Sequence, residues 1–506
     1  MPVDLLKSPR FKAEHLGLPM PDSIHAVSAC LPLWRHNVAY EEGDQSVIGQ
    51  LKSAYPRFCL NPMVRELFRQ TFEPLGKAGF IFPSRHSALE AAGYVANRGG
   101  GQCRVVPIPG QDVVGVAASG GDEKLLKQYW QHTGEIISSR MAVQITQGTR
   151  ITFGTSPSAD IVRQRVADFE GTSAENVRLY PSGMSAMMSA WRTVQKVYTG
   201  APSVQFGFPY VDTLKIQQRF HPSRCEFFPV GSSGDIDQLE TVLRRSPVSA
   251  VFCETPANPL LTCPDLHRLR NLADQFGFLI VIDDTLAACL NLDVLHLSDI
   301  VVTSLTKYFS GYGDLLAGSL TLNPNGARAE ELQQALDEHY ECLIADVDID
   351  ALEANSRDVA DRVNAINQNA TELARRLSEH PRVKFVWHPS LHHSLMNDSD
   401  DCSAPASNYE QLRRPDGGFG GLMSILLHDA ETAAPAVFDA LSVCKGPNLG
   451  TVFTLACPYT ILAHYDELPF VESCGVSRWL IRLSVGIEPI EELWSRFEQA
   501  LSVQSL

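Results

Sequence analysis

The chain has 506 residues and a mass of 55.7 kDa, which predicts about three structural units rather than one. Hydrophobic residues make up 44% and charged residues 20% of the chain, so its composition is globular and excludes wholesale disorder. The formal net charge of -16 would repel phosphate backbones and anionic lipid, which argues against nucleic acid as a partner.

The chain carries no pattern typical of a membrane span or a secretory signal. No stretch reaches the roughly 18 uninterrupted apolar residues of a spanning helix, and the first residues lack a charged start followed by an apolar core. Twelve cysteines are scattered along the chain without a CxxC pair or a histidine at zinc-site spacing. We therefore predict a cytoplasmic protein with reduced thiols, no metal site and no membrane partner.

The first 125 residues are rich in turn formers and are predicted to be an N-terminal extension, irregular or a small α/β unit. Within it, residues 84–94 have helical spacing and residues 113–118 resemble a strand. From about residue 126, helices alternate with short apolar strands, which is typical of a parallel sheet. The clearest strands are Ala250–Glu254, Phe278–Ile282 and Asp299–Thr303. We predict a large domain, residues 126–345, with a mostly parallel, doubly wound central sheet flanked by helices.

Residues 347–379 have long helical patterns, and residues 383–387 and 422–427 resemble strands. This alternation predicts a smaller C-terminal α/β domain, residues 346–506, and makes the whole chain an α/β protein. We interpret the acidic run Asp398–Asp401 as a solvated loop rather than a metal site.

Polar residues follow two consecutive strands of the predicted sheet, at the carboxyl edge where open α/β sheets bind ligands. Asp283 follows one strand, and Ser304–Lys307 follow the next. Upstream, Ser182, Gly183 and Met184 open a helix whose free N–H groups and dipole suit a phosphate. Each signal alone also fits a structural role, since serine is a common helix cap. Together they supply the phosphate cradle, pyridine partner and imine-forming lysine of a pyridoxal 5'-phosphate (PLP) enzyme.

Five ordered motifs resemble the Cys/Met-metabolism family of PLP enzymes, which includes cystathionine γ-synthases and lyases, homocysteine synthases and methionine γ-lyase. The motifs are Ser182-Gly-Met184, Glu254-Thr-Pro-Ala-Asn258-Pro-Leu-Leu261, Asp283-Asp-Thr285, Ser304-Leu-Thr-Lys307-Tyr-Phe-Ser-Gly311 and Ile481-Arg482-Leu-Ser-Val-Gly-Ile-Glu488. This resemblance covers roughly residues 125 to 506 and implies the PLP-dependent transferase fold of type I.

The N-terminal segment resembles that of the longer fungal cystathionine γ-synthases. The stretches that carry this likeness are His25–Trp34, Val38–Gly43, Tyr55-Pro-Arg57-Phe58 and Trp130–Gly134. We expect no reactive group to depend on this segment.

The resemblance assigns roles to single positions. It implies that Lys307 is the Schiff-base lysine and that Asp283 pairs with the pyridine nitrogen. The phosphate-binding set would be Ser182, Gly183, Met184, Ser304 and Thr306. Tyr210 would stack on the cofactor ring and can donate a proton to the leaving group, although the role of a core aromatic also fits it.

Two further positions are implied to bind polar groups of the cofactor and substrate. Asn258 would hydrogen-bond the cofactor's phenolic oxygen, and Arg482 would bind the substrate carboxylate through paired hydrogen bonds. The apolar neighbours of Arg482 indicate burial, and a buried arginine needs an anion.

The chain departs from the family at three places. Family members carry Tyr-x-Arg followed by Asn-Pro-Thr, which reaches the neighbouring subunit's phosphate site, whereas this chain has Arg150-Ile-Thr-Phe-Gly-Thr-Ser-Pro157. We expect Arg140 or Arg150 either to take the place of the family's arginine at the phosphate site or to be an ordinary surface arginine. Tyr312 stands where the family often has histidine, and Asn448 replaces a serine near the carboxylate site. We expect Asn448 to contact substrate and substrate handling to differ.

The reaction implied by the resemblance is γ-substitution on an O-acylated homoserine, with a vinylglycine intermediate trapped by a nucleophile, cysteine by default. Asn448 and Tyr312 favour the alternative of a specialised enzyme that joins O-acetylhomoserine to a carbon or amine nucleophile. A γ-lyase also stays open. By resemblance the active site lies at a subunit interface, so we expect a homodimer or homotetramer that acts on small amino-acid substrates.

Two hypotheses from other functional classes fit the sequence less well. A non-catalytic PLP-fold scaffold conflicts with the intact Lys307, Asp283 and Arg482. A nucleotide-dependent dehydrogenase conflicts with Gly417–Gly421, because that glycine-rich stretch precedes a predicted strand instead of following one.

Overall fold

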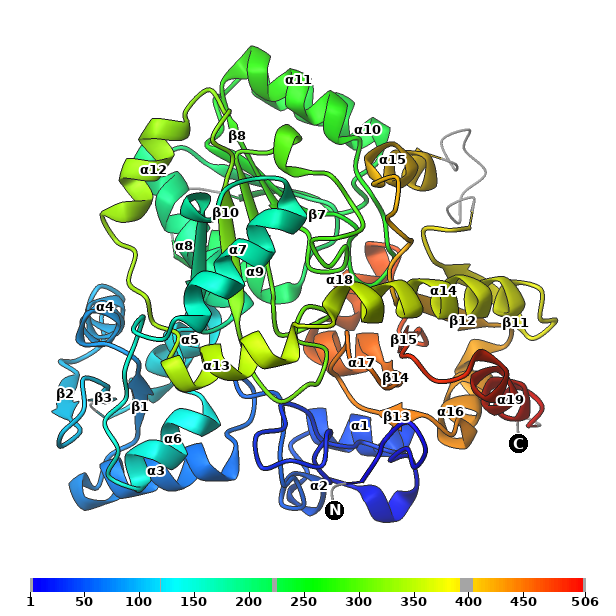
Figure 1. The fold of residues 1–506 in the computed structure, drawn as a ribbon, viewed down its shortest axis with the longest axis horizontal. Coiled ribbons are helices and arrows are strands. Elements are labelled where there is room, and N and C mark those ends of the chain that lie inside the picture. Colours follow the sequence, from blue (N-terminus) through cyan, green and yellow to red (C-terminus); the bar gives the residue numbers. More distant parts are fainter. Residues whose placement is uncertain (1–2, 119, 221–224, 392–403, 504–506) are drawn as a thin grey trace.

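The structure is a computed structural model that describes residues 3–118, 120–220, 225–391 and 404–503. Three β-sheets with their helices make up the chain (Figure 1). The largest sheet lies at the top of that view, the small sheet of the N-terminal segment at lower left and the C-terminal sheet at lower right, with the first 50 or so residues along the bottom. The acidic run 398–401, interpreted above as a solvated loop, lies outside the described residues.

The N-terminal segment forms a small α/β unit around an antiparallel sheet of order β1-β3-β2. Its elements are α3 (Pro62–Phe72), β1 (Gly79–Phe82), α4 (Arg85–Ala96), β2 (Arg104–Pro107) and β3 (Val114–Ala117). Two further helices, α5 (Glu123–Thr133) and α6 (Ser139–Thr146), share its hydrophobic core. The two helices that precede α3, α1 (Trp34–Glu41) and α2 (Gln45–Ile48), lie outside this core, and α1 packs against the C-terminal part of the chain. Ser84 caps α4 by accepting a hydrogen bond from the amide of Ser87, which explains where that helix begins.

The central sheet has seven strands in the order β4-β10-β9-β8-β7-β5-β6. All of its neighbouring pairs are parallel except those of β10, which is antiparallel to both β4 and β9. The strands are β4 (Val177–Tyr180), β5 (Ser203–Phe206), β6 (Cys225–Phe228), β7 (Ala250–Glu254), β8 (Leu279–Asp283), β9 (Ile300–Thr303) and β10 (Gly318–Leu322). Every residue of β7 is buried because helices cover both faces of the sheet, as in other parallel sheets.

The helices of this unit connect consecutive strands or flank the sheet. They are α7 (Ser158–Glu170), α8 (Gly183–Val197), α9 (Val211–Arg219), α10 (Ser233–Leu243), α11 (Leu266–Phe276) and α12 (Ala329–Asp337). The predicted α/β class and mostly parallel central sheet are confirmed. The consequence for function is that the ends of β7, β8 and β9 meet at one edge of the sheet.

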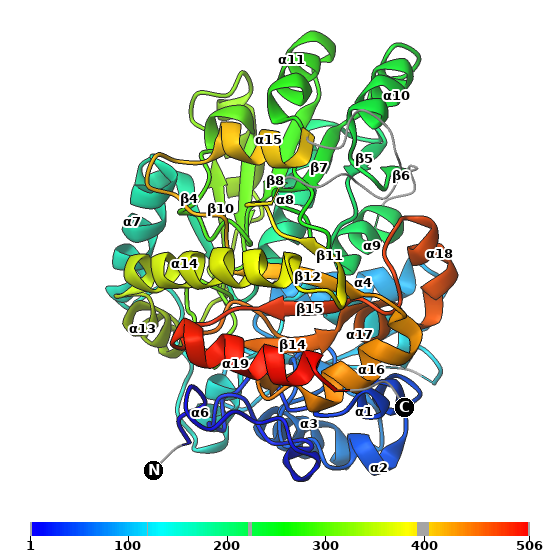
Figure 2. The same cartoon turned by 90° about the vertical axis from the view of Figure 1, so that its right-hand side faces the viewer.

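The C-terminal unit has a five-stranded sheet of order β11-β12-β15-β14-β13, in which only the β13–β14 pair is parallel. Its strands are β11 (Val383–Trp387), β12 (Leu422–Leu427), β13 (Cys444–Lys445), β14 (Leu455–Pro458) and β15 (Ile481–Ser484). Its helices are α14 (Val359–Ser378), α16 (Ala430–Ala440), α17 (Tyr459–His464), α18 (Leu468–Ser473) and α19 (Ile490–Leu501). Helices α14, α16 and α19 lie against this sheet (Figure 2) and bury one shared core. Two other helices from this part of the sequence pack against the central unit instead: α13 (Asp346–Asn355) lies against α7, and α15 (Ala404–Leu412) contributes to the core around α10 and α11.

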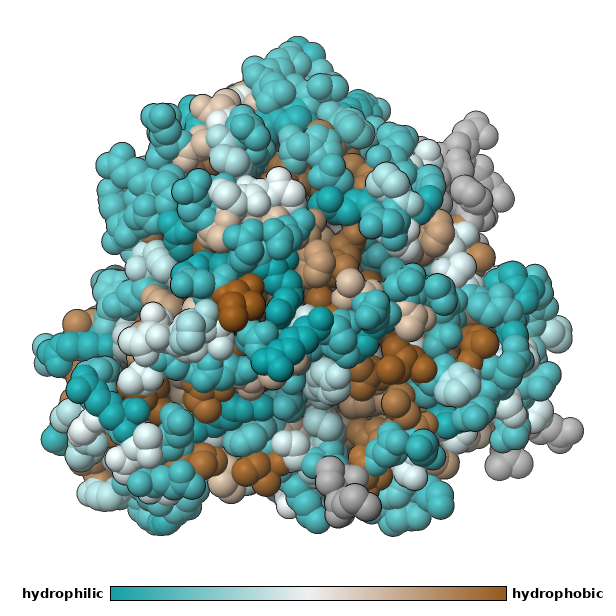
Figure 3. All heavy atoms as spheres, viewed as in Figure 1, coloured by the Kyte–Doolittle hydropathy of each residue, from teal (hydrophilic) through white to brown (hydrophobic). Residues whose placement is uncertain are grey.

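Hydrophilic side chains cover most of the face of the molecule seen in Figure 3. Within the described ranges, every helix is too short or too polar to cross a lipid bilayer.

Candidate active site

One cavity of about 710 Å³ opens between the central sheet, the C-terminal sheet and the N-terminal segment. It lies within the size range of cavities that hold a cofactor together with a small substrate. The predicted residues that line it are Gly183, Met184, Tyr210, Asn258, Asp283, Ser304, Lys307 and Arg482. These positions span some 300 residues of sequence, so the fold alone brings them together.

Lys307 lines the cavity, and its surroundings disfavour the charged form of its amine. Burial lowers its pKa well below the usual value, and the positive charges of Arg482 and Arg57 lower the pKa further. Its Nζ donates to Oδ1 of Asn448 at 2.7 Å and lies 4.5 Å from the centre of the Tyr55 ring. A neutral amine can act as a base and as a nucleophile, which a protonated one cannot.

The start of α8 forms one end of the cavity. Ser182 accepts a hydrogen bond from the Ser185 amide at 3.0 Å and donates to the Gly134 carbonyl, so its hydroxyl serves the helix cap. A Cβ on Gly183 would lie 2.6 Å from Cβ of Ser304, so glycine lets the helix start approach that serine. The amides of the first helical turn have no partner within the helix and suit an anion.

Ser304 and Thr306 are placed differently. Ser304 lines the cavity, and its amide donates to the Thr285 hydroxyl at 2.8 Å. Thr306 is buried, and its hydroxyl donates to the carbonyl of Ala317 and accepts from the same residue's amide. The structure therefore brings Ser304 to the anion end, while the Thr306 side chain is engaged with the main chain.

Asp283 ends β8 and opens onto the same cavity. One oxygen of its carboxyl accepts from the Thr285 amide at 3.0 Å. Burial raises the pKa of this carboxyl, so a cationic partner is needed to keep it ionised. A protonated pyridine nitrogen is such a partner, and the residues present therefore fit PLP at both its ring and its phosphate ends.

Arg482 on β15 is buried and is surrounded by neutral oxygens. Its guanidinium donates to the Pro447 carbonyl at 2.6 Å, to the Asn448 carbonyl at 3.4 Å and to Oδ1 of Asn258 at 3.4 Å. Across the described residues it forms no ion pair. A buried guanidinium with only neutral partners favours an anionic ligand such as a carboxylate.

Tyr210 and its neighbours form the opposite wall. The Tyr210 amide donates to Glu254, and the Asn258 amide donates to the other oxygen of Glu254 at 3.1 Å. The phenol oxygen of Tyr210 accepts from Arg57 at 2.5 Å. Burial raises the pKa of Tyr210 well above 10, whereas the Arg57 charge lowers it.

The expectation that no reactive group depends on the N-terminal segment is wrong. Tyr55 and Arg57 both line the cavity, Tyr55 beside Lys307 and Arg57 beside Tyr210. A signal for them was present in the sequence, because Tyr55-Pro-Arg57 is a Tyr-x-Arg followed by Asn61-Pro62. This motif lies almost one hundred residues before Arg150, the stretch in which the family pattern was expected. Met63 stands in place of its final threonine.

Arg140 and Arg150 are structural arginines instead. Arg140 pairs with Asp314 at 2.8 Å, and Arg150 pairs with Asp112 at 2.9 Å on the surface. Tyr312 is partly exposed, and its hydroxyl donates to Asp358 at 3.3 Å. Of the departures noted in the sequence, Asn448 is the one that contacts Lys307.

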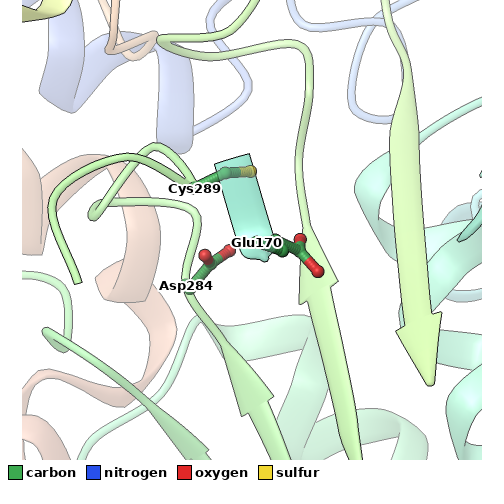
Figure 4. A group of neighbouring side chains, drawn as sticks. All are labelled: Glu170, Asp284 and Cys289. Atoms are coloured by element: carbon green, nitrogen blue, oxygen red, sulfur yellow. The ribbon is translucent and has the colours of Figure 1, made fainter. Parts of the chain in front are cut away.

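A second layer of acidic groups lies behind Asp283. Figure 4 shows Glu170 at the end of α7, Asp284 directly after β8, and Cys289 in the loop that follows. Their polar atoms lie within 4.8 Å of one another, and Thr303 donates a hydrogen bond to Asp284. Burial raises the pKa of both carboxyls, that of Asp284 to about 7, so protonated forms are favoured. The three positions share no motif or regular spacing in the sequence, so the sequence does not predict that they form a group.

The fold and cavity together define a PLP-dependent enzyme with a transferase fold. The sequence profile described as Cys/Met metabolism PLP-dependent enzyme matches residues 147–502. The chain therefore belongs to this family of PLP enzymes, and PLP is its cofactor.

Individual relatives agree over almost the whole chain. A cystathionine gamma-synthase of Neurospora crassa is 32% identical over 96% of this chain and 98% of its own length. A cystathionine gamma-synthase-like enzyme of Amanita muscaria is 34% identical over 96% of this chain and 97% of its own. The solved cystathionine gamma synthase from Xanthomonas oryzae pv. oryzae in complex with cystathionine has a TM-score of 0.58 at 22% identity, covering 69% of this chain and 86% of that one, and shares its fold.

The buried acidic layer predicts how stability depends on pH. The pKa of Asp284 is raised from 3.8 to about 7, so its stabilising contribution is complete below 3.8 and is lost as the pH rises towards 7. We predict that Asp284→Asn reduces the fall in melting temperature between about pH 5 and about pH 8. The exposed Asp416→Asn is the matched control. Equal slopes in wild type and Asp284→Asn would contradict the assignment.

Proposed function

We propose that this enzyme catalyses γ-substitution on an O-acylated homoserine, with cysteine as the default nucleophile and cystathionine as the product. The observation that carries the proposal is that the uncharged Lys307 amine and the buried Arg482 guanidinium open onto one cavity. The relatives named cystathionine gamma-synthase, which match nearly the full chain, support the same chemistry.

The substrate is positioned by its charged ends. Arg482 binds the α-carboxylate through two parallel hydrogen bonds. To do so, its guanidinium gives up some of its hydrogen bonds to neutral carbonyls and forms bonds to the carboxylate instead. PLP, when bound, withdraws electrons from the α-carbon of the amino acid attached to it. Ser304 and the first amides of α8 would hold the phosphate, Asp283 would pair with the pyridine nitrogen, and Asn258, which lines the same cavity, would hydrogen-bond the phenolic oxygen.

Lys307 moves the protons. Its amine is unprotonated, so it removes the α proton and then serves at the β-carbon, which allows the acyloxy group to leave from the γ-carbon. Tyr210 donates a proton towards the departing oxygen, and its anion is stabilised by the Arg57 guanidinium. Asn448 keeps the free amine in place through its Oδ1. The nucleophile then adds at the γ-carbon.

A second candidate is a specialised enzyme that joins an activated homoserine to a carbon or amine nucleophile. Asn448 favours it, because its side-chain amide, in place of the family's serine, is buried behind the cavity and contacts the Lys307 amine. A γ-lyase, which uses water and gives a 2-oxo acid with ammonia, is the third outcome of the same site.

We also propose a cytoplasmic homodimer or homotetramer. All eleven cysteines in the described ranges are free thiols, which suits a reducing compartment.

Product analysis separates the candidates. Purified holoenzyme is given O-acetylhomoserine with and without cysteine, and the products are identified by mass spectrometry. We expect cystathionine as the efficient product when cysteine is present. If the ester is consumed at the same rate and cysteine is not incorporated, the cysteine assignment is wrong and the search moves to another nucleophile. No consumption of any acylhomoserine would overturn the γ-substitution proposal.

The role of Arg482 gives a kinetic prediction. We expect Arg482→Lys to raise KM for the acylhomoserine about 10- to 100-fold with a smaller effect on kcat, because lysine cannot form two parallel bonds to a carboxylate. Arg478→Lys, a partly exposed arginine paired with Glu472, is the control. A variant with unchanged KM would remove Arg482 from the substrate site.

A further inference from the structure

Glu254 is a buried acidic residue of the cavity that takes no part in the proton transfers described above. It ends β7 directly beside Asp283, which ends β8, and both side chains line the cavity. Glu254 is only 7% exposed. A carboxyl in such a place has to be satisfied by hydrogen-bond donors, so its partners indicate what it does.

Each oxygen of the Glu254 carboxyl accepts a hydrogen bond from a main-chain amide. One oxygen accepts from Tyr210, and the other accepts from Asn258 at 3.1 Å. Tyr210 belongs to the loop that follows β5, whereas Asn258 belongs to the loop that follows β7 itself. Because β5 and β7 are neighbours in the sheet, one carboxyl joins the two loops close to the points where they leave it.

The two loops carry side chains that both face the proposed cofactor site. Tyr210 and Asn258 line the cavity together. Oδ1 of Asn258 accepts from Arg482 at 3.4 Å, which leaves its Nδ2 to donate to the phenolic oxygen of PLP. The relative position of the two side chains is set by their main chain, at the very amides that Glu254 binds.

An ionised carboxyl matches these two partners best. Backbone N–H groups can only donate, so both oxygens of Glu254 have to accept. Burial and the charge of Asp283 raise the pKa of Glu254 to about 8, and the two amide bonds lower it. A glutamine at this position would turn its own NH2 group towards one of the amides and could accept from only the other.

We propose that Glu254 is a positioning residue that holds Tyr210 and Asn258 in a fixed relation to each other at the cofactor. It acts through the main chain of both residues rather than on the substrate itself. The inference rests on the proposed function, because it takes Tyr210 as the proton donor and Asn258 as the partner of the phenolic oxygen.

The visible absorption of bound PLP, followed against pH, tests the Asn258 part without turnover. A hydrogen bond from Asn258 stabilises the negative phenolic oxygen and so favours loss of the proton from bound PLP. We expect Glu254→Gln to move the absorption change to higher pH by about one unit, because Asn258 is no longer held. Loss of the Glu254 charge alone would move it to lower pH, since a nearby anion favours the protonated form. An unshifted titration, or a shift to lower pH, would overturn the proposal.

A double variant tests whether Glu254 acts through Asn258. Asn258→Ala removes the hydrogen bond itself, so we expect Glu254→Gln to add no further shift in that background. Additive shifts would contradict the positioning role. If Glu254→Gln yields no folded holoenzyme, Glu254→Asp takes its place: it is one methylene shorter, cannot reach both amides and should shift the titration in the same direction. A wild-type titration in Glu254→Asp would then overturn the proposal.

Glu488 provides the matched control for the loss of a buried carboxyl. It is 2% exposed and accepts from the Thr454 amide at 2.7 Å and from the Thr454 hydroxyl at 2.8 Å. We expect Glu488→Gln to lower the melting temperature and to leave the absorption titration of PLP unchanged. An equal shift in this control would mean that general destabilisation accounts for the effect, and the positioning role would fall.

Turnover tests the Tyr210 part. We expect Glu254→Gln to lower kcat for the acylhomoserine about 10- to 100-fold with a smaller change in KM, because the proton donor is displaced while Arg482 is kept. A wild-type kcat beside a shifted absorption would remove Tyr210 from the proposal. If the wild-type enzyme consumes no acylhomoserine, the proposed function fails, and the absorption titration still decides whether Glu254 holds Asn258.

Discussion

The rest of the site depends on keeping one buried amine uncharged. As a base and as the proposed attachment point of PLP, Lys307 needs an unprotonated amine, and burial together with the nearby guanidinium groups of Arg482 and Arg57 lowers its pKa well below the usual value. Lys445 provides a useful contrast. It is fully buried away from the cavity, its amine donates to the carbonyls of Pro32 and Asp439, and its pKa falls only to about 8. Lys445 thus ties segments of the chain together, whereas Lys307 faces the cavity.

The positive charges around Lys307 are not equivalent. Arg57 is neutralised by the buried carboxylate of Asp212 at 2.6 Å, so it is a fixed part of the wall. Arg482 contacts neutral oxygens, so its charge is available to an anionic substrate. Two guanidiniums therefore share the cavity wall, and of the two only that of Arg482 has no counter-charge among the described residues and suits the proposed substrate carboxylate.

Much of this arrangement could be predicted from sequence because it follows local patterns. The strands β7 and β12 have the predicted limits, and the helix that opens at Gly183 starts after its serine cap. The strand-end positions of Asp283 and Lys307 follow from the parallel order of β8 and β9. Thr306 shows the limit of motif transfer, since nothing in the motif reveals that its hydroxyl is bonded to Ala317.

The parts that sequence patterns missed are tertiary. Strand β10 inserts antiparallel between β4 and β9, although more than one hundred residues separate it from β4. Arg57 contacts Asp212, which is 155 positions away in the sequence. The segment around Arg57 has few helices or strands that a sequence pattern could predict. Such contacts depend on how whole segments are buried against one another, which sequence periodicity does not reveal. Both the N-terminal wall of the cavity and the acidic layer of Glu170 and Asp284 are formed by contacts of this kind.

The central claim is that Lys307 is the lysine that carries PLP. Borohydride treatment of the holoenzyme, followed by peptide mapping, identifies the lysine to which the cofactor becomes permanently attached. We expect a single modified peptide containing Lys307, and no modified peptide from Lys307→Ala. Attachment at Lys445 or at any other lysine would contradict it.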